Sequence, residues 1–285
     1  MVSYTLVFAA LAAAVSGAPC ASNATIKCPI VFDGRIAASA ALTDLDSSST
    51  SPFNPDYVKG NSLKWSNIIL FPSVPNSRFD NASHRPLEVT LSDKSVFQSQ
   101  NGFRRAGLQF AGDSNNGSPG YTGIKTLHFS VKQDPARALN LSHEYLNVWH
   151  EAADYSADQI MFETGTILGQ TGLPKNTFKF FDRNMKQLWS TAVDGTAWQN
   201  FAVTLNINSN TVQVYYSKDD EPLKSVTSAV SADLSGQGQF QIGILKKPTG
   251  TSDVVNSGYQ ESGLNEGQIY GGLFIEDSSN GCISL

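Results

Sequence analysis

The sequence predicts an all-β protein, built as an antiparallel β-sandwich or jelly roll with one concave face. From Pro86 onward, short segments in which polar and apolar residues alternate recur with turn residues between them. About eleven such strands without a convincing amphipathic helix are typical of this fold class. The predicted strands are Leu87–Ser92, Phe103–Phe110, Lys125–Lys132, His143–Glu151, Gln159–Thr166, Thr177–Phe181, Gln187–Thr191, Trp198–Asn208, Thr211–Ser217, Gly238–Lys247 and Gln268–Glu276.

The amino-terminal segment, residues 1–18, has the form of a secretory signal peptide. An apolar run from Leu6 to Val15 is followed by the small residues Ser16, Gly17 and Ala18. Residues 19–285 are expected to form a single β-jelly-roll domain, because no low-complexity linker divides them. We therefore expect a secreted, extracellular protein.

Two further segments complete the description of the backbone. The region Ile36–Pro86 is rich in Ser, Pro and Asn, which predicts long loops with a few short strand pairings. Asn206–Asn210 contains three asparagines and lies between two of the clearest strands, so it is predicted to be a hairpin turn.

Composition excludes several classes of partner. A net charge of −5 and scattered Lys and Arg residues provide no basic patch, so nucleic acid is not an expected partner. No segment after the signal peptide approaches the roughly 18 apolar residues of a spanning helix, so no membrane partner is expected either. The four histidines have no metal-ligand spacing. We expect a monomer that uses neither a metal nor a cofactor.

Three cysteines and four sequons fit an oxidising, secretory environment. Cys28 and Cys282 are expected to join the two ends of the domain, while Cys20 could replace Cys28 as the partner or stay free. Acceptor sequons for N-linked glycans occur at Asn23, Asn81, Asn116 and Asn140.

The segment Leu141–Gly165 carries the clearest functional pattern. Strand alternation places five residues on one face, whereas Leu146 and Val148 point into the core. Trp and Tyr beside Asn and Glu suit a sugar, because a pyranose offers flat C–H faces for stacking and hydroxyls for hydrogen bonds. The concave face is therefore predicted to bind carbohydrate. Its five residues from this strand are His143, Tyr145, Asn147, Trp149 and Glu151.

Two more strands are predicted to contribute to the same groove. In Phe103–Phe110, Leu108 and Phe110 face the core, and in Gly238–Lys247 the residues Phe240, Ile242 and Ile244 do so. If these strands neighbour the Trp149 strand, the polar residues on their opposite faces converge on one groove. These residues are Arg105, Gln109, Gln239 and Gln241.

Hydrolysis of a glycosidic bond normally requires two carboxyl groups, about 5 to 10 Å apart. Glu151 is the first candidate, at the end of its strand. Along one strand His143 and Glu151 would lie roughly 26 Å apart, too far for a catalytic pair, so the partner is expected to come from another strand. Glu163 is the leading candidate for that partner, followed by Glu144 and Asp158; a bulge would also bring His150 or His128 into consideration.

The order and spacing of five pieces resemble the fungal secreted glycoside hydrolase family 131. The resemblance implies a β-jelly roll that acts on β-1,3, β-1,6 and β-1,4 glucans. The pieces are FDGRI (Phe32–Ile36), FRRAGLQF (Phe103–Phe110), HEYLNVWHE (His143–Glu151), WQNFAVTL (Trp198–Leu205) and QIGILKKP (Gln241–Pro248).

The resemblance also implies two glutamates and a histidine in the cleft. Glu151 matches one glutamate, but Gly107 stands where the other would lie, and Gln241 stands at or near the position of the histidine. Two interpretations follow: a secreted β-glucan hydrolase with a relocated second carboxylate, or a protein that kept the groove and binds cell-wall glucan without turnover. The jelly roll also resembles that of glucuronan lyases, so lyase chemistry stays open at this point.

Overall fold

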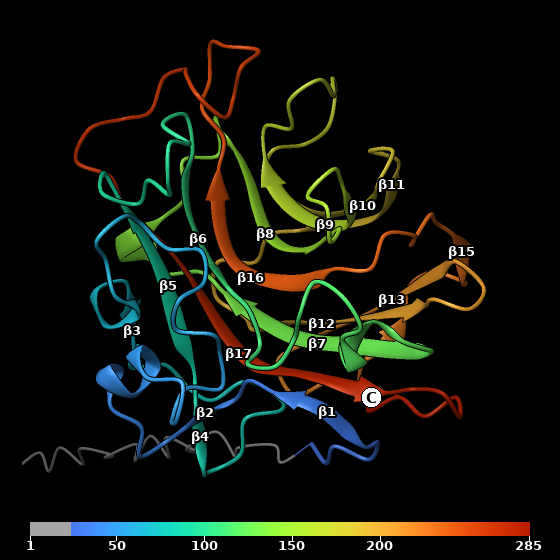
Figure 1. The fold of residues 1–285 in the computed structure, drawn as a ribbon. Helices are drawn as coiled ribbons and strands as arrows, with labels where there is room; N and C mark the ends of the chain where they lie inside the picture. The colour runs from blue at the N-terminus through green and yellow to red at the C-terminus, as the bar shows by residue number, and fades with distance from the viewer. Residues whose placement is uncertain (1–23) are drawn as a thin grey trace, which may run out of the picture.

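Two antiparallel β-sheets packed face to face form the framework of residues 24–285, the part of the chain that the computed structural model describes (Figure 1). The predicted antiparallel sandwich is confirmed, and each segment predicted as a strand forms one, with ends within a few residues of those expected. The predicted signal peptide, Cys20 and Asn23 lie outside the described residues.

The smaller sheet has six strands and is the one that carries the candidate site. In Figure 1, β16 lies between β6 and β8, as the strand order requires. In spatial order its strands are β11 (Gln187–Ala192), β10 (Thr177–Asp182), β9 (Asp158–Gly165), β8 (Glu144–Glu151), β16 (Gln239–Lys246) and β6 (Arg104–Leu108).

The larger sheet has nine strands and supports the smaller one from behind. Its central path runs through β14 (Lys224–Ser225), β13 (Thr211–Lys218), β12 (Gln199–Asn206), β7 (Ile124–Lys132), β17 (Asn265–Asp277), β5 (Leu87–Ser92) and β3 (Ile69–Leu70). Off this path, β1 (Ile30–Asp33) pairs with β17, and β15 (Val230–Ser231) pairs with β13.

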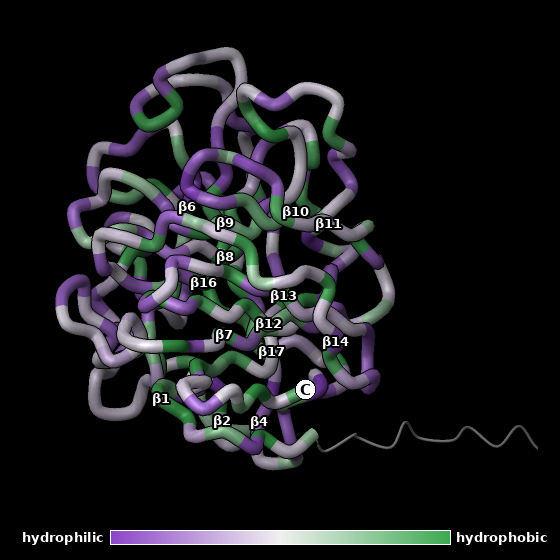
Figure 2. The backbone as a smooth tube through the Cα atoms, turned by 90° about the vertical axis from the view of Figure 1, so that its right-hand side faces the viewer, coloured by the Kyte–Doolittle hydropathy of each residue, from purple (hydrophilic) through white to green (hydrophobic). Residues whose placement is uncertain are grey.

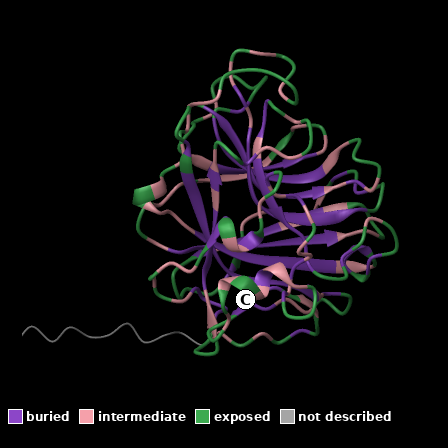
Figure 3. Ribbon diagram, turned by 60° about the vertical axis from the view of Figure 1, so that its left-hand side comes forward, coloured by how far each residue is buried: buried purple, intermediate pink, exposed green. Residues whose placement is uncertain are grey.

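The main hydrophobic core lies between the two sheets. Apolar residues alternate along the strands toward this layer, and in Figure 2 the hydrophobic colour follows the strands. Figure 3 shows the same strands buried and the loops exposed. Phe129 on one sheet packs edge-on against Phe162 on the other, with ring centroids 5.0 Å apart. Burial of each such side chain contributes about 1.5 to 3 kcal/mol.

The predicted loops and hairpin are also present. Between Ile36 and Pro86 the chain forms only short elements, and β12 and β13 are joined by the predicted turn, in which Asn210 has a φ of 51°. The short elements of the described residues are β2 (Ile36–Ala37), β4 (His84–Arg85), η1 (Leu42–Asp46), η2 (Trp65–Asn67), η3 (Pro119–Tyr121) and η4 (Pro135–Arg137).

A disulfide joins the two ends of the described chain. Cys28 and Cys282 are bonded, with Cα atoms 5.8 Å apart, as the sequence predicted. Cys28 precedes β1 and Cys282 follows β17, so the bridge reinforces the pairing of these two strands. Among residues 24–285, no helix has the length and apolar character needed to cross a membrane.

Candidate active site

The three strands expected to share a groove are neighbours in the smaller sheet. Gln241 pairs with Trp149 across β16 and β8, and Gly243 pairs with Gly107 across β16 and β6. Phe240, Ile242 and Ile244 enter the main core as predicted, which leaves the alternate side chains of β16 on the outer face. The sequence-based assumption that these strands adjoin is therefore confirmed.

A cavity of about 630 Å³ lies on this outer face. Its floor is formed by a second apolar cluster, in which Trp149 packs with Phe103, Leu146 and Leu245. Side chains from the loops before β6, from the β8–β9 turn and from the segment after β16 complete its walls. The residues that line it are Tyr57, Val58, Phe97, Gln98, Gln100, Phe103, Arg105, Leu146, Trp149, Glu151, Tyr155, Asp158, Leu245, Lys247 and Val254.

A hydrogen-bonded relay orients the Glu151 carboxylate. Gln241 Nε2 donates to Glu151 Oε2, while Gln241 Oε1 accepts from the Arg105 guanidinium at 3.2 Å. Because each end of the amide has a partner of the right type, the orientation of Gln241 is determined. Burial raises the pKa of Glu151 above its usual value, and the charge of Arg105 and the bond from Gln241 oppose this rise.

Asp158 supplies the second carboxyl group of the cavity. It is the first residue of β9 and pairs directly with Glu151, the last residue of β8. Burial, followed by the charge of Glu151, raises the pKa of Asp158 to about 7. Its carboxyl group has no hydrogen-bond partner within the described residues, in contrast to that of Glu151. Asp158 therefore keeps its proton up to near-neutral pH, while Arg105 and Gln241 favour the ionised form of Glu151, a combination that suits acid and base roles.

Tyr57 brings a phenol to the same point from a segment that was expected to be loop. Its hydroxyl oxygen accepts from Gln239 Nε2 and, at 3.4 Å, from Gln241 Nε2. Both lone pairs of the oxygen are thereby used, so its proton is free to be donated toward the cavity. Burial, together with the charge of Glu151, raises the pKa of Tyr57, which keeps that proton in place.

The prediction that Tyr145 faces the groove is wrong. A register shift between Leu146 and Val148 places a bulge at Asn147, which exchanges the faces of the residues before it. Tyr145 packs in the main core and its hydroxyl donates to Glu266 at 2.9 Å, whereas Leu146 lines the cavity. Asn147 is fully buried outside the cavity lining, and its side-chain amide has no hydrogen-bond partner within residues 24–285.

Three other predicted residues also lie outside the cavity lining: Gln109, Glu163 and Gln241, whose buried amide contacts Glu151, Tyr57 and Arg105 instead. The side chain of Gln109 is buried and donates through Nε2 to the Asp113 carbonyl, so it braces a loop rather than facing a ligand. Glu163 is fully buried, and neither of its carboxyl oxygens has a hydrogen-bond partner in the described chain. Asp158, which the sequence ranked behind Glu163, takes its place in the cavity.

Replacing Glu163 by glutamine is expected to increase stability at neutral pH. Burial and the charge of Glu144 raise the pKa of Glu163 well above its ordinary 4.5, so the folded state holds a proton that the unfolded state releases. The free energy of unfolding of the wild-type protein therefore decreases as pH rises from 4.5 toward the pKa of Glu163 in the folded state. Urea denaturation of both proteins from pH 4 to 8 should show a gap that widens with pH; a constant gap would contradict the protonated state.

Gly107 is required by the packing beside it. A Cβ atom at this position would lie 2.6 Å from Gln241 Oε1 and 3.3 Å from Trp149 Cη2. The two departures from the family pattern are therefore adjacent in space, and the amide of Gln241 occupies room that a glutamate at position 107 would need. Besides Glu151, the carboxyl group that lines this cavity is that of Asp158.

The four histidines have contacts away from the Glu151 carboxylate. His150 stacks on Tyr121 in the core, His128 pairs with Glu276 on the other sheet, and His143 contacts the Lys247 carbonyl. His84 contacts Asn81 Oδ1 at 2.8 Å. Among the described residues, no group of three His, Cys, Asp or Glu side chains is arranged to hold a metal ion.

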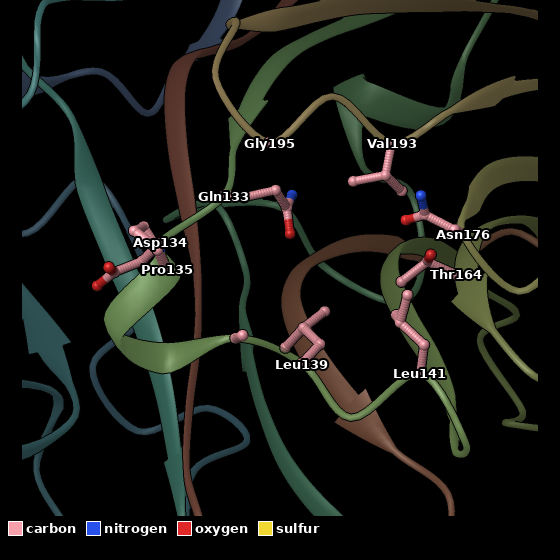
Figure 4. A pocket seen from close by; sticks show the side chains of 10 residues that line it. Gln133, Asp134, Pro135, Leu139, Leu141, Thr164, Asn176, Val193 and Gly195 are labelled. Carbon is pink, nitrogen blue, oxygen red and sulfur yellow. The ribbon is translucent and has the colours of Figure 1, made fainter.

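A second cavity, of about 290 Å³, lies where the segment after β7 meets the edge strands of the smaller sheet. Figure 4 shows Gln133, Leu139, Asn176 and Val193 around it. Its one carboxylate, Asp134, is paired with Arg137 at 2.5 Å. This cavity therefore lacks the facing carboxyl groups found between β8 and β9.

Sequence reasoning missed Tyr57, Tyr155 and Lys247 as members of the cavity. Tyr57 belongs to an irregular segment whose position no periodicity reveals, and Tyr155 belongs to a turn. Lys247 follows β16 and is paired with Glu144. For Asp158 the sequence does contain a signal. A hairpin of β8 and β9 places the last residue of the first strand beside the first residue of the second, and both of these residues are acidic.

Comparison with known proteins identifies the family of the chain. The model of the glycoside hydrolase 131 catalytic N-terminal domain matches residues 30–281. The fold is similar to a GH131 β-glucanase catalytic domain from Podospora anserina, with a TM-score of 0.70, 21% identity, and coverage of 87% of this chain and 96% of that chain.

It is also similar to the catalytic domain of a glycoside hydrolase family 131 protein from Coprinopsis cinerea, with a TM-score of 0.67, 20% identity, and coverage of 87% and 94%. No curated protein sequence matches the chain. Since the family model spans most of the sequence, the resemblance is confirmed and the chain belongs to glycoside hydrolase family 131 as a catalytic domain.

Proposed function

We propose that this protein is a β-glucan hydrolase in which Asp158 is the general acid and Glu151 is the base or nucleophile. The observation that carries the proposal is the direct pairing of these two residues across β8 and β9, with both side chains lining one cavity. Glycoside hydrolysis requires two such carboxyl groups on opposite sides of the scissile bond.

In this mechanism the proton moves from Asp158 to the glycosidic oxygen as the bond to the anomeric carbon breaks. Glu151, ionised and held by Gln241, either removes a proton from the attacking water or attacks the carbon itself, after which water hydrolyses the intermediate. Water thus adds across the bond, and two sugar hydroxyls are formed. Positive charge on the sugar in the transition state is stabilised by the adjacent carboxylate.

The substrate class is supported by the cavity and by the family. The apolar cluster that contains Trp149 and Phe103 forms the floor of the cavity, while Arg105 and Tyr57 offer donors that suit sugar hydroxyls. The similar structure from Podospora anserina is described as a β-glucanase. We infer a glucan with β-1,3, β-1,6 or β-1,4 linkages as the substrate.

The setting of the reaction is inferred from the termini and sequons. We propose that residues 1–18 are removed on secretion and that residues 19–285 act outside the cell as a monomeric domain. The Cys28–Cys282 disulfide supports an oxidising compartment. Asn81, Asn116 and Asn140 are exposed and remain the glycosylation sites proposed for the described chain.

The alternative is a binding protein that has kept the fold without turnover, and the replacements at Gly107 and Gln241 favour it. Product release from laminarin, pustulan and cellooligosaccharides by the purified protein separates the two functions. A pull-down on insoluble glucans accompanies the assay. Turnover supports the hydrolase, whereas glucan binding without products from any of these substrates would establish the binding protein.

The pH dependence of kcat/KM on β-glucan is expected to be bell-shaped. Asp158 must be protonated, so activity falls as pH rises through its pKa of about 7. Glu151 must be ionised, so activity also falls on the acidic side, above the ordinary 4.5 because burial raises its pKa. A carboxyl titration by NMR should show that Glu151→Gln lowers the pKa of Asp158; an unchanged value would exclude their coupling.

A further inference from the structure

The turn that connects β8 to β9 places one exposed aromatic side chain beside the carboxylate pair. Tyr155 lies between Glu151 and Asp158 in the chain and lines the same cavity, yet its side chain is 63% exposed. Trp149, on the other side of Glu151 along β8, is almost fully buried in the floor. The ring of Tyr155 therefore stands at the open mouth of the cavity.

The backbone of Tyr155 has a conformation that a bulky residue rarely adopts. Its φ is 60°, and it is the one aromatic residue among the seven non-glycine positions with positive φ in residues 24–285. Hydrogen bonds within the turn, from Tyr155 N to the Ala152 carbonyl and from Ala152 N to the Ala157 carbonyl, maintain this conformation. Strain of this kind accumulates at functional sites, since glycine or asparagine would relieve it.

The hydroxyl group of Tyr155 is also held in place. Asn115 Nδ2, from the loop between β6 and β7, donates to the Tyr155 oxygen at 2.6 Å. The Asn115 carbonyl in turn accepts from Gly238 N, next to the start of β16. Two separate loops thus fix an exposed ring, and the hydroxyl keeps its own proton for a further acceptor.

We propose that Tyr155 forms a binding subsite for one pyranose ring of the substrate, adjacent to the Glu151–Asp158 pair. The ring stacks on a flat C–H face of the sugar, and the hydroxyl donates to a sugar oxygen. This inference rests on the proposed function for the identity of the ligand, a β-linked glucose chain.

Affinity measured without turnover tests the subsite. Calorimetric titration of Glu151→Gln with laminarihexaose, cellohexaose and gentiohexaose is compared with the same titration of Glu151→Gln/Tyr155→Ala. The affinity for at least one oligosaccharide is expected to fall about threefold to tenfold when the ring is removed. The matched control is Tyr259→Ala in the same background, because Tyr259 is 62% exposed and lies outside the cavity lining.

Tyr155→Gly separates a ligand-binding role from a structural one. Glycine accepts the positive φ, so this variant is expected to lose affinity like Tyr155→Ala while its midpoint of urea denaturation rises. A lower midpoint would mean that the ring is structural. In the otherwise wild-type protein, Tyr155→Ala should raise KM for β-glucan while kcat stays the same.

Unchanged affinity in Tyr155→Ala, an equal loss in Tyr259→Ala, or no binding of any of the three oligosaccharides would overturn the subsite. Turnover by the wild-type protein alongside unchanged affinity would leave the proposed hydrolase intact. If the wild-type protein shows no turnover but binds oligosaccharide in a manner that depends on Tyr155, the subsite is supported and the proposed hydrolase function is contradicted.

Discussion

Asp158→Asn is expected to lower kcat on β-glucan by about 10²-fold to 10⁴-fold, with binding preserved. The amide keeps the size of the side chain but supplies no proton to the leaving oxygen. An aryl β-glucoside with an acidic phenol as leaving group needs little protonation, so its turnover should be largely retained in this variant. The ratio of the two activities, measured side by side, identifies Asp158 as the acid.

Glu151→Gln is expected to lose turnover of both substrates by a similar factor, because neither bypasses the base or nucleophile. Gln241 can still donate to the new amide oxygen, so oligosaccharide affinity should remain. Glu163→Gln is the matched control, since Glu163 is buried outside the cavity lining. Full turnover in Asp158→Asn together with loss in Glu163→Gln would reverse the assignment of the second carboxyl group.

Removal of the Cys28–Cys282 disulfide is expected to lower the free energy of unfolding by about 2 to 5 kcal/mol. The bridge spans a sequence separation of 254 residues, and cross-links over long loops restrict the unfolded chain most. It also holds Ser284 near β17, where its hydroxyl donates to Glu276 of that strand at 2.7 Å. Urea denaturation of Cys28→Ser/Cys282→Ser against the parent gives the difference directly.

Cys20→Ser is introduced into both proteins, so that the third thiol cannot form a replacement bridge. Turnover of the folded protein at 25 °C should be unchanged, because neither cysteine of the bridge lines the cavity. Equal unfolding midpoints for the two proteins would show that pairing of β1 with β17 holds the termini without the disulfide.

The residues of β16 illustrate what could be predicted without coordinates. Alternation along Gly238–Lys247 correctly separated Phe240, Ile242 and Ile244 from Gln239 and Gln241, because a pleated strand alternates its side chains whatever its neighbours are. The register between neighbouring strands cannot be deduced from the alternation within one strand. The bulge at Asn147 leaves no mark on the sequence, since Tyr145 and Leu146 both suit a buried position.

The choice between Asp158 and Glu163 depended on a register shift and on depth, because the shift between His150 and Glu151 brings Asp158 opposite Glu151. Both residues belong to β9 and both are acidic, so the sequence could rank them only by their expected faces. Glu163 lies opposite Leu146 beneath other side chains, whereas Asp158 lies opposite Glu151 at the cavity. Burial at a given position is the sum of contacts from β8, β10 and the loops above, and local alternation contains no information about it.

The sequence by itself determined the all-β class, the strands, the bridge between the termini and one carboxylate of the site. These features follow from local backbone periodicity and from residue types that occur rarely in the chain. Tertiary structure alone decided the partner of Glu151, the relay through Gln241 and Arg105, and the arrival of Tyr57 from a loop. Each of these joins residues distant along the chain or depends on strand register, which only packing of the two sheets determines.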